Sequence, residues 1–207
     1  LDRAHRLVPA DDMVTLTLAT VLIGLDDARA AELLAGLIDK GHDRAPIWLG
    51  LAASRLRSGN AAGAVVAIAR RLTRHAVDAD RSTEAALRAL AIATASATDA
   101  PGWCGVMAGL SPVVVLRDPA AGPVRVLFDG RPILDATRQQ AAARRARRLD
   151  VVATDGRVLL GSPIDLAAIR TVEGFVEVTP RGGLAGWAWR PAAPEHAPTL
   201  TLRGRSG

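Results

Sequence analysis

Side chains that could carry out chemistry are few and far apart in this chain. The four histidines are His5, His42, His75 and His196. None of them has a second His or Cys at the spacing of metal ligands, and Cys104 is the single cysteine, so neither a zinc site nor an internal disulfide is expected. Ser162 stands in Gly-Ser-Pro and not in the Gly-x-Ser-x-Gly of hydrolases, which predicts a turn. The sequence therefore predicts no catalytic residue, no metal site and no cofactor within these residues.

Two groups of residues could bind a ligand without catalysing a reaction. Trp187 and Trp189 are two residues apart on an expected strand, so their rings lie on the same face. Such a pair forms either a platform that stacks sugars or the core of a sandwich with few other aromatics. The second group is a cluster of arginines: Arg144, Arg145, Arg147 and Arg148. This arginine cluster is either a solvated face or a patch for an anionic partner, such as a polysaccharide, a phospholipid or a nucleic acid.

The distribution of charge argues against a nucleic-acid partner, although the pI is near 11.0. The 207 residues carry 26 basic and 21 acidic side chains, and Lys40 is the only lysine. Basic and acidic side chains are equal in number up to residue 100. Beyond it basic side chains are in excess, and most of this excess is the arginine cluster. Aromatic residues make up only 3%, which leaves few rings to stack bases. Since no apolar run approaches the roughly 20 residues of a membrane span, we expect a cytoplasmic chain that does not span a membrane, and we expect no nucleic-acid partner.

The elements that must position these residues begin with internally repeated helices. With residues 45–78 placed under residues 11–44, Ala30 falls on Ala64 and Leu34 on Ile68, at a shift of 34. Apolar residues in each unit recur at the spacing of an amphipathic helix. Each unit is interrupted once by a glycine followed by Asp or Asn, which stops one helix and starts the next. Each unit is therefore expected to be a helix, a tight turn and a second helix.

A period of 34 residues with two helices is that of tetratricopeptide repeats. The second unit resembles this family at Trp48, Leu51, Ala52, Gly59 and Ala64. Arg55 and Arg71 depart from the pattern, because the family usually has an aromatic and a small residue there, and the first unit lacks the tryptophan. An ordinary pair of helical hairpins is the alternative. A further helix at about 82–97 either caps the stack or begins another repeat, so residues 1–98 would form the helical domain.

From residue 101 onward, Val-rich runs separated by Gly and Pro predict β-structure. The expected strands are residues 113–116, 124–128, 149–154, 158–160, 172–178, 185–189 and 199–202. Residues 136–148 have a strong helix propensity and are either a short helix or a strand and loop.

The second half of the chain also contains an internal sequence repeat. Residues 101–106 align with residues 173–178 at a shift of 72, and Pro-Ala-Ala at 119–121 falls on Pro-Ala-Ala at 191–193. The second copy then contains three additional residues, after which residues 124–127 align with residues 199–202. This match predicts two tandem β-modules, at 101–171 and 172–207, with one irregular β-domain as the alternative. Residues 4–9 look like the end of a helical unit that precedes residue 11, and the second module looks cut short. We therefore expect an interior segment of a longer protein.

The predicted fold class is α + β and multidomain. An N-terminal α-helical tetratricopeptide-like solenoid is followed by antiparallel β-sandwich-like modules. Residues 186–194, GWAWRPAAP, resemble a recurring β-module motif, and residues 126–132, VLFDGRP, resemble its closing strand and turn. Similar modules, preceded by tetratricopeptide-like repeats, occur in large bacterial proteins that carry family-2 glycosyltransferase domains for surface polysaccharides.

This resemblance implies a non-catalytic accessory region, for protein interaction and spacing, of such a protein. Its helical repeats would bind a protein partner or another domain of the same chain, and polysaccharide is a further candidate partner. The nucleotide-sugar fold expected of the transferase is not found in these residues, so whether they belong to an enzyme stays open. Two alternatives remain: a stand-alone tetratricopeptide adaptor that binds a protein or peptide, and a carbohydrate-binding β-module that uses Trp187 and Trp189.

Overall fold

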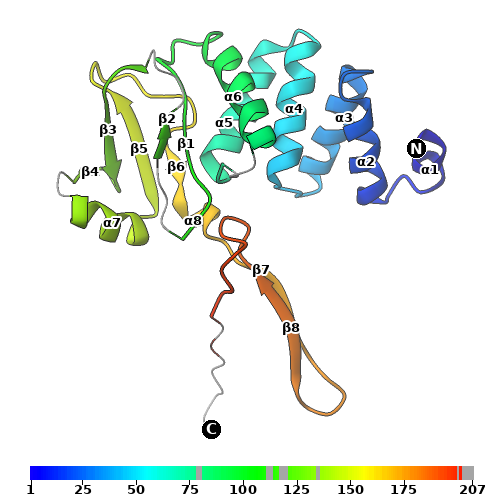
Figure 1. Cartoon of the computed structure of the whole chain (residues 1–207). Coiled ribbons are helices and arrows are strands. Elements are labelled where there is room, and N and C mark those ends of the chain that lie inside the picture. Colours follow the sequence, from blue (N-terminus) through cyan, green and yellow to red (C-terminus); the bar gives the residue numbers. More distant parts are fainter. Residues whose placement is uncertain (78–80, 111–113, 117–120, 134–135, 200, 202–207) are drawn as a thin grey trace.

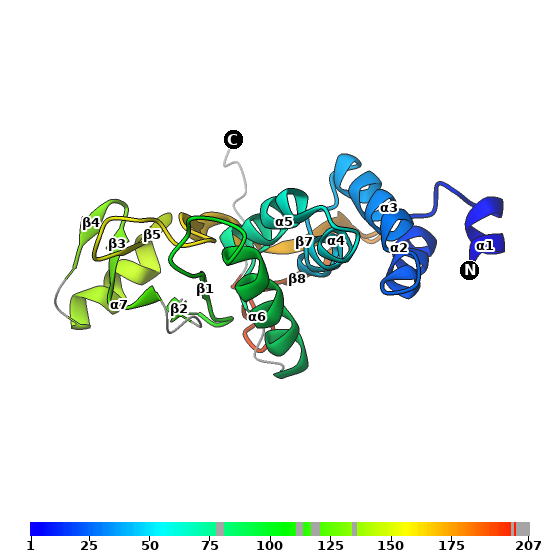
Figure 2. The ribbon, with the colours of Figure 1, turned by 90° about the horizontal axis from the view of Figure 1, so that it is seen from above.

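The chain folds into a row of helices followed by antiparallel sheets (Figure 1). Seen from above, the body is elongated, with the first helix at one end and the main sheet at the other (Figure 2). The predicted order, helices first and antiparallel strands second, is confirmed. The structure is a computed structural model that describes residues 1–77, 81–110, 114–116, 121–133, 136–199 and 201.

The helical row consists, in chain order, of α1 (Asp2–Leu7), α2 (Asp12–Leu22), α3 (Asp27–Asp39), α4 (Ala45–Arg57), α5 (Ala61–Arg74) and α6 (Arg81–Ala95). Three of these helices begin with a polar side chain that satisfies free backbone N–H groups. These side chains are Asp11, Asp26 and Asn60, and each accepts a hydrogen bond from a backbone N–H two or three residues further on. The last two follow the glycine interruptions in the sequence, so local capping explains where the helices start.

The helix pairs α2–α3 and α4–α5 bury residues at equivalent positions. Ala30 in α3 and Ala64 in α5 are both 0% exposed, and a shift of 34 relates them. Leu34 and Ile68, one turn further on, are also fully buried. Small residues let neighbouring helices approach closely, and the aliphatic side chains fill the space between the pairs. The second helix of each pair therefore presents the same buried stripe to its neighbours.

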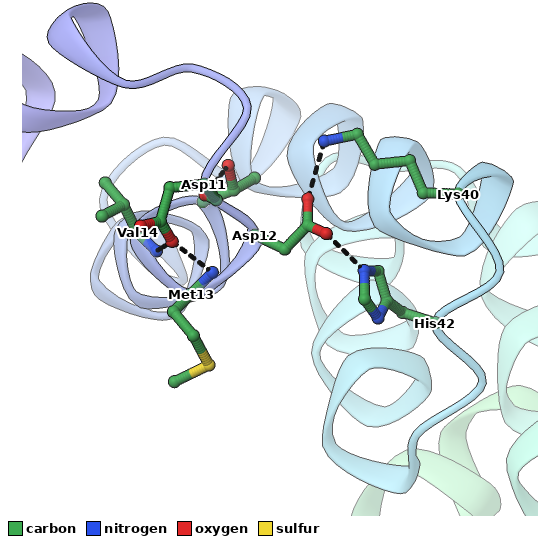
Figure 3. A network of polar contacts seen from close by, with 7 residues as sticks. Asp11, Asp12, Met13, Val14, Lys40 and His42 are labelled. Atoms are coloured by element: carbon green, nitrogen blue, oxygen red, sulfur yellow. Dashed lines mark hydrogen bonds and ion pairs between the residues drawn. The ribbon is translucent and has the colours of Figure 1, made fainter.

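A carboxylate at the start of the first pair binds cationic side chains at its end. Asp12 lies in the first turn of α2, and its Oδ1 contacts Lys40 Nζ at 2.7 Å (Figure 3). Its Oδ2 contacts His42 Nε2, also at 2.7 Å. Negative charge is favourable at a helix N-terminus and positive charge at a C-terminus. These contacts tie the two ends of the pair together at the surface.

A second cluster of this kind joins the ends of α4 and α5. Asp43 lies just before α4 and accepts hydrogen bonds from Trp48 Nε1 at 2.7 Å and from His75 Nε2 at 3.1 Å. Arg74 Nε is 3.0 Å from the other carboxylate oxygen. Arg74 is 34 residues after Lys40, so both units carry a cation at the end of their second helix. The tryptophan used as a repeat marker is thus also a hydrogen-bond donor.

His75 makes the stability of the helical row sensitive to pH. Burial, together with the nearby charge of Arg71, holds the pKa of His75 below its usual value of 6.5, against the opposing effect of Asp43 and with a further contribution from Arg74. Below about pH 6.5 the unfolded chain takes up a proton that the folded chain resists, so the free energy of unfolding should fall as the pH falls. We expect wild type to lose more stability than His75→Gln between about pH 7 and pH 5.5, measured by urea unfolding. Equal losses would contradict this assignment.

Arg71 is a charged side chain buried at the end of α5. It is 1% exposed, and its Nη1 donates to the backbone carbonyls of His75 and Ala76, each at 2.9 Å. The equivalent residue in the first unit is Leu37, which is also buried. The guanidinium therefore replaces an aliphatic side chain where the chain leaves the helical row, because the carbonyls of that segment need donors. This explains why Arg71 departs from the small residue of the repeat pattern.

The main sheet of the second part has four antiparallel strands in the order β4-β3-β5-β6. Its strands are β3 (Val124–Phe128), β4 (Arg131–Pro132), β5 (Arg148–Ala153) and β6 (Ile164–Asp165), with helices α7 (Ala136–Arg145) and α8 (Leu166–Ile169) beside them. A separate hairpin pairs β1 (Cys104–Val106) with β2 (Val114–Leu116). Cys104 and Val106 share a core with Leu149 and Val151 of β5. The β1–β2 hairpin and the main sheet thus enclose one apolar interior.

A continuous core joins the helical row to the sheets. Trp103 is 0% exposed and belongs to the same buried cluster as Leu72 of α5 and Leu160. Backbone hydrogen bonds also link the two parts, because Val77 N donates to Val106 O at 2.7 Å and Ala108 N donates to Val77 O at 2.9 Å. Hydrogen bonds and apolar packing therefore both cross the boundary, and they fix the helical row to the sheets.

Several expected elements differ from the observed ones. Residues 136–145 form a helix, which settles the choice left open by the sequence. Residues 158–160 make isolated bridges to Val152 and Trp103 and no continuous strand, since they pair with two different segments. The short helix α8 has too few residues to show a period. The strand expected at 199–202 and the Pro-Ala-Ala at 119–121 lie partly outside the described residues.

Candidate functional site

A two-stranded hairpin, β7 (Glu173–Val178) and β8 (Leu184–Trp189), extends away from the body (Figure 1). The two strands pair along their whole length, with Phe175 opposite Trp187 and Glu173 opposite Trp189. Thr179 closes the turn, because its N–H donates to Gly183 O at 2.8 Å. Directly opposed residues share a face of a sheet. One side of the hairpin, here called the aromatic face, therefore carries Glu173, Phe175, Glu177, Ala185, Trp187 and Trp189.

The rings of the aromatic face are open to solvent. Phe175 and Trp187 are each 50% exposed, and Trp189 is 44% exposed. The rings of Phe175 and Trp187 meet edge to face, with centroids 5.8 Å apart and planes at 89°. Such a pair holds its rings in a fixed geometry and leaves part of each ring free for a ligand. Trp187 and Trp189 thus lie on one strand, as expected, and they are surface residues of the described chain.

Sequence reasoning missed Phe175 and Glu173 as neighbours of the tryptophans. The alternation of residues 173–178 places Glu173 and Phe175 on the same face of the strand. Only the register of the hairpin shows that they lie opposite Trp189 and Trp187. Two carboxylates beside three rings suit a ligand that has apolar ring faces and hydroxyl groups to donate, which is the chemistry of a neutral sugar.

Glycine is required in the middle of the hairpin. A Cβ placed at Gly186 would lie 2.1 Å from the carbonyl oxygen of Phe175, and one at Gly174 would lie 2.2 Å from that of Trp187. These distances are far below van der Waals contact with backbone that cannot move aside. The Gly-Phe and Gly-Trp pairs of the sequence therefore allow the two strands to approach at the level of the rings.

The arginine cluster is divided between two elements. Arg144 and Arg145 lie in the last turn of α7, whereas Arg147 and Arg148 follow it. The Arg148 guanidinium binds both carboxylate oxygens of Asp150, and this carboxylate raises the pKa of Arg148.

The Asp129 carboxylate accepts from the backbone N–H groups of Arg147 and Arg148 at 3.0 and 2.9 Å. Carboxylates are therefore interspersed with the arginines, which makes a continuous anion site weaker than the sequence alone suggests.

The remaining reactive residues are used in local structure. Burial raises the pKa of Cys104 to about 12, so its thiol stays protonated and unreactive at neutral pH. Ser162 Oγ accepts a hydrogen bond from Val151 N at 2.9 Å, and Asp165 caps α8 through Ala168 N at 2.9 Å. In the part of the chain that the structure describes, His, Cys, Asp and Glu side chains nowhere gather in threes that could hold a metal ion.

A shallow groove lies where the helical row meets the sheets. It has a volume of about 420 Å³ and is lined by Ala69 of α5, by residues 98–100 and by residues 157–162. Arg157 at its rim is bound to Asp155 at 2.8 Å. Its lining is mostly apolar, and the side chains of Thr98, Arg157 and Ser162 are engaged in local hydrogen bonds. The groove is therefore less well equipped for ligand binding than the aromatic face.

Comparison with known proteins gives no match to a protein-family model, to a curated protein or to a solved structure. Among the residues that the structure describes, no helix combines the length and apolar character needed to cross a bilayer.

Proposed function

We propose that this chain is a non-catalytic accessory region, for protein interaction and spacing, of a bacterial glycosyltransferase-type protein that makes surface polysaccharide. The observation that supports a spacing role is the shared core at Trp103, Leu72 and Leu160, which fixes the helical row to the sheets. A tetratricopeptide-like reading of the row is supported by the equivalent buried positions in α3 and α5 and by the cations Lys40 and Arg74.

A row of this kind offers a protein partner, or another domain of the same chain, an extended surface. α2 exposes Met13 (65%) and Val21 (50%), apolar side chains that such a partner would cover. The glycosyltransferase part of the proposal rests on the resemblance of residues 186–194 and 126–132. Sequencing the coding DNA on both sides of these residues tests it: we expect an in-frame nucleotide-sugar transferase domain. Flanks without such a domain would favour a stand-alone adaptor.

A carbohydrate-binding role is the second candidate, and the exposed aromatic face favours it. We expect neutral oligosaccharides such as cellohexaose, at millimolar concentration, to change the tryptophan fluorescence of the chain. An acidic oligogalacturonate should bind less well, because Glu173 and Glu177 flank the rings.

Substitution of one ring tests this role directly. Trp187→Ala should weaken binding of the neutral sugar about 3- to 10-fold, the range for one aromatic contact. Trp48→Phe is the matched control, since Trp48 lies in the helical row and should report no sugar. Two outcomes would contradict the carbohydrate-binding role. Either no sugar changes the tryptophan fluorescence, or wild type and Trp187→Ala respond to the sugar equally.

A further inference from the structure

The two helix pairs differ in how the first helix of each pair is covered. At the shift of 34, Met13 and Thr17 of α2 fall on Ile47 and Leu51 of α4. Ile47 is 2% exposed and Leu51 is 1% exposed. By contrast, Met13 is 65% exposed, and Thr17 is also an exposed residue. Equivalent positions of the repeat are therefore buried in the second pair and open to solvent in the first.

In the second pair, the cover of these positions is the preceding helix, α3. Ile47 and Leu51 belong to the same buried cluster as Leu34 of α3. Gly50 lies on the same side of α4, and a Cβ placed there would be 3.1 Å from Leu34 Cδ1. This side of α4 is thus in direct contact with α3.

The direction and the chemistry of this cover are also defined. The Asp27 carboxylate at the start of α3 accepts hydrogen bonds from Arg57 Nε and Nη2 at the end of α4, both at 2.9 Å. The two helices are therefore antiparallel. α3 buries small and aliphatic residues at intervals of four and three, which form one stripe along a helix: Ala30, Leu34 and Leu37.

The equivalent side of α2, here called the α2 stripe, consists of Met13, Leu16, Thr17 and Thr20. It carries no charge. Thr17 Oγ1 donates to Met13 O at 2.7 Å, and Thr20 Oγ1 donates to Leu16 O at 2.8 Å. Because both hydroxyl protons are used within the helix, the methyl groups of the two threonines can be covered without the loss of a donor to water. The α2 stripe is thus suited to an apolar cover.

The described chain does not itself cover the α2 stripe. α1 precedes α2, but none of its residues is buried, and it is set apart at the end of the row (Figure 2). A second copy cannot repeat the contact between α3 and α4, because its own α3 is already covered and Leu34 is only 1% exposed. The far end of its row packs on the sheets through Leu72 and Trp103. The cover must therefore be a different helix.

We propose that the α2 stripe binds an amphipathic helix of a partner protein, antiparallel to α2, in the position that α3 occupies beside α4. The partner helix presents Ala and Leu at intervals of four and three, as α3 does. Its C-terminal end lies beside Asp11, an exposed carboxylate at the start of α2, so a basic last turn is favourable. This docking site rests on the proposed role in protein interaction and specifies the partner.

A peptide of residues 26–42 is a suitable probe, because its stripe already packs on α4 in this fold. We expect the labelled peptide to bind the whole chain at up to about 500 µM in fluorescence anisotropy, since one helix gives a small and weak contact. Thr17→Leu introduces the residue found at the equivalent position of α4 and should tighten binding about 3- to 10-fold, because apolar area is added to the contact. A misfolded variant could not produce this gain.

Thr17→Glu should weaken peptide binding by at least about 10-fold, because a carboxylate would be buried without a partner. Ala28→Glu is the matched control: Ala28 is exposed on α3, outside the buried stripe, and its replacement should leave binding unchanged. A peptide that carries Leu34→Glu should not bind. Circular dichroism of each variant checks that the helices are intact.

Three results would overturn the docking site. The peptide could fail to bind at the highest concentration, or it could bind wild type and Thr17→Glu equally well. Sedimentation velocity could instead show a dimer that Thr17→Glu disrupts, which would assign the α2 stripe to a second copy. The sequence of the flanking DNA remains a separate test: a transferase domain there, together with no peptide binding, would support the accessory role and refute this docking site.

Discussion

Replacement of Trp103 by alanine is expected to lower the free energy of unfolding by about 3–5 kcal/mol, the range for a fully buried large aromatic. Trp103 is 0% exposed and lies in the core that joins α5 to the sheets. The cavity would open at this junction, so we further expect the single thermal transition to separate into two, one for the helical row and one for the sheets. Differential scanning calorimetry measures both effects.

Trp103→Phe is the informative control for this prediction. Within the described part of the chain, the buried Nε1 of Trp103 has no hydrogen-bond partner. Phenylalanine removes that unpaired N–H while it keeps most of the apolar volume, so the loss should stay below about 1.5 kcal/mol. Equal losses for Phe and Ala would mean that the indole ring does not fill the junction as described.

Replacement of Gly161 by alanine should be nearly as damaging, for a steric reason. Gly161 has a φ of +94°, and a Cβ there would lie 2.4 Å from Cys104 O and 2.8 Å from Leu72 Cβ. The backbone conformation alone costs about 1 kcal/mol for alanine, and the overlap with a packed core adds about 2–3 kcal/mol. We expect a loss of about 3–4 kcal/mol in urea unfolding.

Gly59→Ala separates the two causes. Gly59 also has a positive φ, +82°, but a Cβ there would meet nothing within 4 Å. Its replacement should therefore cost only the conformational part, about 1 kcal/mol. If Gly161→Ala were no worse than Gly59→Ala, the close approach of α5 and β1 at Gly161 would be refuted.

Local signals in the sequence predict the helices of the helical row and the strand β3 well. Residues 124–128 form β3 as expected, because alternation and flanking Gly and Pro are properties of neighbouring residues. The starts of α3 and α5 follow from Asp26 and Asn60, whose caps act within three residues. Such features need no knowledge of the rest of the fold.

Long-range features are less accessible to sequence reasoning. The role of Trp103 depends on contacts with Leu72 and Leu160, which are distant in the chain. Likewise, Trp187 and Trp189 are recognisable as a pair, but their neighbours Phe175 and Glu173 follow from a strand register that the turn length sets. The buried Arg71 donates to two carbonyls outside its helix, which periodicity within the helix does not reveal.

The direct packing of α5 on the sheets has a mechanical consequence. Hydrogen bonds from Val77 N to Val106 O and from Ala108 N to Val77 O cross the same boundary as the apolar core. A rotation of one part would have to break these bonds together with the packing, so thermal motion cannot bend the body there gradually. Molecules bound at the helical end and at the sheet end of the body would keep a constant distance and orientation. A pulling force on one of them would be transmitted to the other.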